Sequence, residues 1–334
     1  MKDKNIEYFV STERIEKYRV IFPNTFDDIC EAAKYIRQDK ESLEYLEKLR
    51  QSIYGEVPEG LKIEPEEGNI TANFAPIFAL LSYLDECEEE MDRRGFDSET
   101  RTNVYRKFEN ILVSHKASKG FYGCSRMIFF WAKHYIKPDI FKIDNLEFEI
   151  TKYCCDDIFR DTEGNLIPLR EFTAENGKIT GISVLRGGAD GEKVSFNGEP
   201  ALLKGDHVIS VHIPAKADIS EEACVGYYKH ALEFFAKYYP ECKIKAFMCH
   251  SWLMDPQLAQ ILKPDSNILT FQKFFSPTTH TRSSGEEVMT FVFGKRPDNL
   301  EDLPDNTTLT KNLKKRYIEN NPIYAHIGIH FLER

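Results

Sequence analysis

The stretch "HVISVHIP" (207–214), taken together with "KIKAFMCHSWL" (243–253), decides the fold of this chain. Both segments are rich in β-branched and aromatic residues whose side chains alternate between two faces, which is the pattern of a β-strand. Between them, from about Ser220 to Tyr239, apolar residues recur at helical spacing over roughly 30 Å, enough to cross a sheet. The order strand, helix, strand predicts a parallel pair joined by a right-handed crossover.

The segments on either side extend the same sheet domain. Residues 151–205 alternate short strand-like pieces with turn sequences such as "ENGK" (175–178), which is typical of hairpins. Downstream, the sequence predicts a short helix in "DPQLAQIL" (255–262), a helix over about 306–319 and a final strand in "IYAHIGIHFL" (323–332). We also expect strands in "NILTFQKFF" (267–275) and "EEVMTFVFG" (286–294), because both are rich in apolar residues.

The first part of the chain predicts helices instead. Thr25 and Asp28 form a cap-like start ahead of apolar residues at helical spacing, and a second such pattern over 74–84 runs into the acidic "DECEEEMD" (85–92). At "FKIDNLEFEI" (141–150) the apolar residues change from helical spacing to every second position, which is the pattern of a strand. We therefore predict an α/β (α+β) protein, with a helical domain over 1–140 and a mixed β-sheet domain with helices on both faces over 141–334.

Composition narrows the classes of partner. The chain has 334 residues, 42% of them hydrophobic, and a formal net charge of −10 without a run of basic residues, which argues against nucleic-acid binding and favours small-molecule or protein partners. The beginning of the sequence lacks the apolar stretch of a signal peptide, and no apolar run approaches the roughly 20 residues that span a bilayer. We expect a cytoplasmic protein without a membrane partner; the sequence does not indicate an oligomeric state.

The cysteines predict structural thiols. The eight are scattered without a CxxC pair, so neither a disulfide framework nor a cysteine zinc site is indicated. His326 and His330 would suit a metal only on a helix; on a strand, which Gly328 and the β-branched neighbours favour, they lie about 13 Å apart, and we expect no metal. "RGGADGE" (186–192) is interpreted as a turn, because it does not open a helix. The adjacent pair Cys154 and Cys155 has no explanation at this level.

Cys249, His250 and Ser251 bring three reactive side chains together, but strand alternation separates them. Cys249 and Ser251 point to one face and His250 to the other, so neighbours in sequence do not form a dyad. Packing in the core is the favoured interpretation of Cys249, and a hydrolase with Cys249 as nucleophile is the alternative. His250 and His212 lie near the carboxyl ends of the two predicted parallel strands, where open sheets bind ligands. They are candidate general bases, unless they only satisfy buried polar groups.

The order of these segments resembles the GNAT superfamily of N-acyltransferases. "VHIP" (211–214), "CHSWLMDPQL" (249–258) and "SNILTFQKFF" (266–275), after the junction "FKIDNLEFEI", are similar to the bacterial two-domain GNAT-like acyltransferases, in which a helical N-terminal domain precedes a GNAT-like one. The resemblance implies an acyl-coenzyme A cleft between the two central strands. It also implies cofactor contacts along the first strand and at the following helix start, which map here to His212, Ile213, Lys216, Ala217 and Ser220.

The resemblance predicts an acyl-CoA-dependent N-acyltransferase that acts by direct transfer on a small amine or amino-acid-like acceptor. His250 is the first candidate for the base and His212 the second. The chain departs from the superfamily at the loop before the helix, where "AKADIS" (215–220) replaces a Q/R-x-x-G-x-G/A pattern and Asp218, Glu221 and Glu222 add negative charge. The alternative is therefore a catalytically silent GNAT-like protein that binds a metabolite or a protein.

Overall fold

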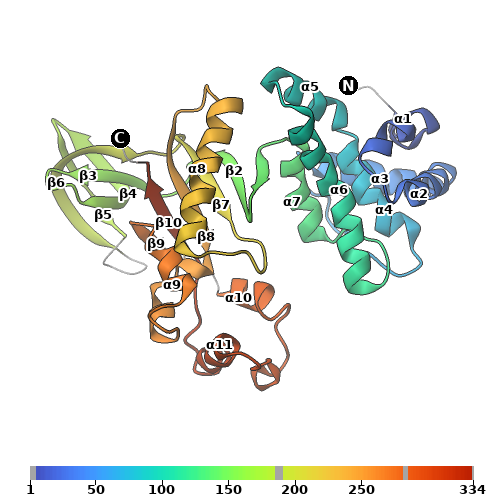
Figure 1. The fold of residues 1–334 in the computed structure, drawn as a ribbon. Coiled ribbons are helices and arrows are strands. Elements are labelled where there is room, and N and C mark those ends of the chain that lie inside the picture. The colour runs from blue at the N-terminus through green and yellow to red at the C-terminus, as the bar shows by residue number, and fades with distance from the viewer. Residues whose placement is uncertain (1–4, 185–190, 281–284, 333–334) are drawn as a thin grey trace. The chain divides into compact units, whose positions relative to one another are not determined.

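The computed structural model describes residues 5–184, 191–280 and 285–332 (Figure 1). The chain divides into two compact units, Met1–Phe141 and Lys142–Arg334, and each is described by itself. The first is helical and the second holds a mixed sheet, so the predicted α/β class is confirmed. Most of the turn expected at 186–192 lies outside the described residues.

The first unit is built from helices, as predicted. The pattern over 25–50 divides at Asp39, whose side chain accepts a hydrogen bond from the Ser42 amide (2.9 Å) and caps the second helix of the pair. Thr25 does stand at the start of the first helix, but its hydroxyl donates to Glu109 instead of capping. The helices are α1 (Thr12–Lys17), α2 (Phe26–Gln38), α3 (Lys40–Ser52), α4 (Ile70–Leu81), α5 (Leu84–Arg94), α6 (Ser98–Lys119) and α7 (Arg126–Ile136), with 3₁₀ turns at Ile6–Val10 and Tyr18–Val20.

The second unit is organised around a six-stranded sheet with the order β1-β2-β7-β8-β10-β9. The central strands β7 and β8 are parallel and are connected by α8, which confirms the predicted strand, helix, strand unit. The pairs β2 with β7, β8 with β10 and β9 with β10 are antiparallel. The bounds are β1 (Ile140–Ile143), β2 (Leu146–Lys152), β7 (His207–His212), α8 (Glu221–Tyr238), β8 (Ile244–Ser251), β9 (Thr278–His280) and β10 (His326–Phe331).

Each face of the central strands has its own core. On one face, Tyr228 of α8 packs its ring against Phe148 and Phe247, with centroids 6.2 and 4.7 Å away. On the other face, apolar residues of β7, β8 and β10 form a core with residues that flank or lie within an inserted four-stranded barrel. Its buried members are Tyr153, Ile158, Leu202, Val208, Ala246, Met248 and Ile329. Apolar side chains are buried on both faces of β7 and β8, so the two cores together hold the parallel pair in place.

The barrel accounts for the hairpins expected over 151–205. Its strands are β3 (Asp157–Asp161), β4 (Leu166–Glu175), β5 (Lys178–Ser183) and β6 (Glu192–Leu202), all paired antiparallel. At "ENGK" the chain turns through Asn176 and Gly177 with positive φ angles of 50° and 77°, the conformation of a two-residue hairpin turn. Phe159, Leu169 and Ile179 fill the interior.

The last part of the chain corrects two predictions. The segments expected as strands at 267–275 and 286–294 contain the helices α9 (Asn267–Gln272) and α10 (Glu286–Phe291). Short apolar runs fit either structure, and here a helix buries Phe271 in one and Val288 with Met289 in the other.

The remaining C-terminal elements follow the sequence more closely. The segment 255–262 forms a 3₁₀ turn, Pro256–Gln260, after another at Trp252–Met254, and a third lies at Leu300–Asp302. The helix α11 (Thr308–Ile318) and the final strand β10 are as predicted. None of the helices in the described parts of the chain combines the length and the apolar composition needed to cross a bilayer.

The Tyr228 hydroxyl provides a test of the packing under α8. It is buried and has no hydrogen-bond partner among the described residues. We expect Tyr228→Phe to raise the free energy of unfolding by about 1 kcal/mol, because it removes an unsatisfied polar group and keeps the ring. Tyr228→Ala should lower it by about 3–5 kcal/mol through the cavity that it leaves. Urea denaturation measures both, and a destabilised phenylalanine variant would contradict this packing.

Candidate functional site

The parallel ladder between β7 and β8 ends before the strands do. Its paired residues run from His207 and Ile244 to Ser210 and Met248. Beyond that point β7 continues to His212, paired with Glu147 of β2, and β8 continues to Ser251, paired with His326 of β10. Each strand therefore follows its outer neighbour, and the β7–β8 ladder does not extend past Ser210 and Met248. We refer to this divergence, between residues 211–212 and 249–251, as the β7–β8 gap.

His212 and His250 share one face at the gap. Ser210 lies opposite Met248 in the register, so the residues two positions further along, His212 and His250, point to the same side of the sheet. Glu149 of β2 lies opposite Ser210 and belongs to that face too. The structure therefore brings together the two histidines that the sequence singled out, one from each side of the gap.

His212 is oriented by a carboxylate. Its Nε2 lies 3.0 Å from Oε2 of Glu149, and both side chains are largely buried. A carboxylate bonded to one imidazole nitrogen fixes the ring orientation and the tautomer. The sequence analysis missed Glu149, although the alternation in "LEFEITK" (146–152) places it on the face opposite Phe148 and Ile150.

His250 is exposed and has no hydrogen-bond partner within the described ranges. Partial desolvation lowers the pKa of His250 below its ordinary value; the charge of Glu287 acts to raise it, and that of His212 lowers it further. A lowered pKa keeps the imidazole neutral near pH 7, and a neutral imidazole can accept a proton.

The loop between β7 and α8 carries the other predicted binding residues. Lys216 has a positive φ of 67°, and the Ala217 amide bonds to the Pro214 carbonyl (3.1 Å), so the chain turns sharply toward the helix. Ser220 is the N-cap residue of α8 but its side chain makes no capping bond. Its amide instead donates to Asp218 (2.9 Å), which lowers the pKa of that carboxyl and keeps it ionised.

A family model described as the GNAT-like C-terminal domain matches residues 140–330. The chain belongs to this GNAT-like family. The predicted resemblance to two-domain GNAT-like acyltransferases is thereby confirmed, while a search of curated proteins finds no match.

Solved structures extend the likeness to 94–96% of this chain. An acyltransferase in complex with decanoyl-CoA and teicoplanin is 17% identical with a TM-score of 0.60, over 94% of this chain and 86% of that one. The same TM-score and 18% identity hold for an acyltransferase with decanoyl-CoA, over 96% and 87%. A mutant bound to octanoyl-CoA is 17% identical with a TM-score of 0.60, over 94% and 86%. At these identities the structural likeness shows the fold alone; the ligands in those structures belong to the predicted class of co-substrate.

Cys249 lies on the other face of β8 in the GNAT-like sheet. Its side chain is buried, and burial raises the pKa of the thiol to about 12, so the thiolate that a nucleophile needs is not formed near pH 7. Ser251 accepts a hydrogen bond from the Leu253 amide (3.1 Å) and begins the next turn. This agrees with the structural role predicted for Cys249 and removes support from the hydrolase alternative.

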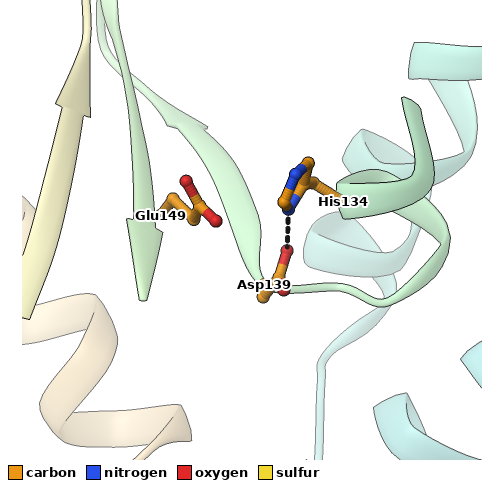
Figure 2. A group of neighbouring side chains, drawn as sticks. All are labelled: His134, Asp139 and Glu149. Atoms are coloured by element: carbon orange, nitrogen blue, oxygen red, sulfur yellow. Dashed lines mark hydrogen bonds and ion pairs between the residues drawn. The ribbon is translucent and has the colours of Figure 1, made fainter. Parts of the chain in front are cut away.

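Three further histidines, His134, His326 and His330, form hydrogen bonds within their own structural unit. His326 and His330 lie on β10, and their Nδ1 atoms are 3.1 and 2.7 Å from the backbone oxygens of Tyr324 and Phe274. Figure 2 shows His134 of α7 with Nδ1 3.3 Å from Oδ1 of Asp139, in the first unit. Glu149, drawn in the same figure, belongs to the second unit, where it holds His212 as described above.

Thiol labelling tests the burial of Cys249. In the folded protein we expect iodoacetamide to modify the exposed Cys154 first and to leave the buried Cys87, Cys124, Cys224 and Cys249 unmodified, because burial raises the pKa of each of these four thiols. Mass spectrometry after digestion gives the order of modification, and labelling in denaturant is the control. Rapid labelling of Cys249 in the native state would restore the hydrolase alternative.

Proposed function

We propose that this GNAT-like chain is an acyl-CoA-dependent N-acyltransferase that transfers an acyl group directly to the amine of a small or amino-acid-like acceptor. The observation that carries the proposal is the early end of the β7–β8 ladder at Ser210 and Met248. Past that point the inner edge of β7 no longer follows β8, and His212 and His250 lie on the same face of the sheet. An extended, amide-bearing arm can pair with such an edge as an added strand would.

The binding residues follow from that placement. The pantetheine arm of coenzyme A would run along β7 at His212 and Ile213, which lie past the end of the β7–β8 ladder. Its diphosphate would meet the loop at Lys216 and Ala217 and the start of α8 at Ser220, since the first amides of a helix and its dipole favour anions. The solved acyltransferases of the same fold are complexes with CoA thioesters, which supports this choice of donor.

Charge at the helix start favours the alternative, a catalytically silent GNAT-like protein that binds a metabolite or a protein. Asp218 is ionised, and Glu221 and Glu222 form the acidic first turn of α8. These groups stabilise the helix but repel a diphosphate, and Lys216 offsets only part of the repulsion. The donor should therefore be held mainly by backbone contacts along β7.

The transfer step needs a base and a backbone donor, but no covalent enzyme intermediate. The amine nitrogen of the acceptor attacks the thioester carbonyl, a C–N bond forms, and the C–S bond breaks to release the CoA thiolate. His250 accepts the proton that the amine loses, which can then pass to the thiolate. Backbone amides at the gap would stabilise the negative charge on the carbonyl oxygen. His212, held by Glu149, is the second candidate for the base.

The acceptor is proposed to be a small molecule with a nucleophilic amine. One of the solved structures contains the glycopeptide teicoplanin beside decanoyl-CoA, which shows that this fold can hold a donor and a bulky small-molecule acceptor together. A screen of acyl-CoAs of different chain length against an amine library would identify both substrates of this chain.

Calorimetry with acetyl-CoA and decanoyl-CoA tests the donor site. We expect saturable binding that weakens in Lys216→Glu and tightens about two- to fivefold in Asp218→Asn, because one change adds a negative charge near the diphosphate and the other removes one. Desulfo-CoA with the wild-type protein controls for contacts to the sulfur. An absence of binding up to millimolar ligand would favour the catalytically silent alternative.

Replacement of the proposed base tests the chemistry. His250→Ala should lower kcat/KM by about 10²- to 10⁴-fold, the usual contribution of a general base, and leave the melting temperature unchanged because the side chain is exposed. His230→Ala is the matched control: His230 lies 2.8 Å from Asp144 and belongs to α8, which covers the sheet face opposite His250, and its loss should not affect transfer. Parallel losses of activity and melting temperature in His250→Ala would indicate a structural histidine.

A further inference from the structure

Glu287 is a half-buried glutamate in the first turn of α10. Its Oε2 is buried without a hydrogen-bond partner among the described residues. The preceding residue, Glu286, forms an ion pair with Arg296 at the surface. Two adjacent acids on one helix thus differ, because one is ion-paired and the other has a buried oxygen without a hydrogen bond from the described residues. A buried carboxylate oxygen without a hydrogen bond is costly, so it calls for an explanation.

The position of Glu287 is fixed by the packing of its neighbours. Val288 and Met289 are buried in an apolar cluster with Leu313 and Tyr317 of α11. The Tyr317 hydroxyl donates to the carbonyl of Gly285 (2.5 Å), the residue that precedes α10. The backbone on both sides of Glu287 is therefore held from α11, and the carboxylate stays where the fold places it.

The same packing brings α10 to the end of β8. Trp252, two residues after His250, packs against the cluster that contains Val288 and Met289. In Figure 1, α10 lies at the end of the sheet where β8 gives way to the C-terminal helices. The charged or titratable groups that act on His250 are Glu287 from α10 and His212 from β7, and His212 is itself bonded to Glu149 of β2.

We propose that Glu287 is a positioning residue for His250, and that its carboxylate stabilises the imidazolium formed when His250 takes the proton from the acceptor amine. The proposal rests on the proposed function. In the resting enzyme the partial desolvation of His250 keeps the ring neutral. During transfer the proton moves from the amine nitrogen to a ring nitrogen of His250, and the charge of Glu287 favours the positive charge that forms there.

A structural role for Glu287 predicts something different. An acid in the first turn of a helix stabilises that helix through the macrodipole, so its removal would lower the melting temperature. If Glu287 is instead retained for catalysis at the expense of stability, its removal does not lower the melting temperature. Its neutral isostere leaves the melting temperature unchanged or raises it, because an amide is less costly to bury than an unpaired charge.

The experiment compares Glu287→Gln with Glu286→Gln, a matched change one residue away. For Glu287→Gln we expect kcat/KM to fall about 10- to 100-fold, the range seen for carboxylate partners of metal-bound histidines. The acid limb of the pH profile should move to lower pH, because the charge of Glu287 raises the pKa of His250 and its loss lowers it. Glu286→Gln should change neither. The imidazole resonances of His250, assigned with His250→Ala and titrated by NMR without substrate, should show the same shift.

Three results would overturn the proposal. One is an NMR titration of His250 that is the same in Glu287→Gln and the wild type. Another is a melting temperature that falls in step with activity. The third is a higher KM for the acceptor with an unmoved pH profile, which would assign Glu287 to binding the acceptor's ammonium group. If His250→Ala retains full activity, the base proposed above is wrong, whereas the NMR titration still decides whether Glu287 acts on His250.

Discussion

Everything proposed for this chain depends on two parallel strands that pair for only part of their length. Parallel pairing requires a long crossover, and α8 supplies it. Past Ser210 and Met248, however, β7 stays with β2 and β8 stays with β10, so each strand keeps one partner and loses the other. Backbone amides and carbonyls that lose a strand partner still need hydrogen bonds. We propose that the gap receives a ligand that offers amides along an extended line, as an added strand would.

The sequence predicts the unit formed by β7, α8 and β8 well. The alternation in "HVISVHIP" and the helical spacing over 220–239 leave few arrangements, because the crossover must be right-handed and must cover the sheet. The positions of His212 and His250 then follow from alternation alone. Alternation does not show where the β7–β8 ladder ends, because that depends on the pairing of β7 with β2 and of β8 with β10. The divergence at Ser210 and Met248 becomes visible only in the structure.

The failures of the sequence analysis concern short segments and long-range contacts. "NILTFQKFF" and "EEVMTFVFG" are rich in residues that favour strands, yet they form helices because their few apolar residues pack better on one side of a helix than on the edge of a sheet. The error about α10 also concealed Glu287, since a residue assigned to a strand is not expected in the first turn of a helix. Glu149 could have been found from its alternation in β2, but its pairing with His212 required the register.

The two histidines of the gap are not equivalent, and the difference follows from their neighbours. The ring of His212 is fixed by Glu149, which suits a side chain that shapes the wall of the site. His250 is exposed and is neutral near pH 7, because partial desolvation and His212 both lower its pKa. The charge of Glu287, from α10, acts in the opposite direction and raises the pKa of His250. We therefore propose His250 of β8 as the base and leave the edge of β7 to the donor.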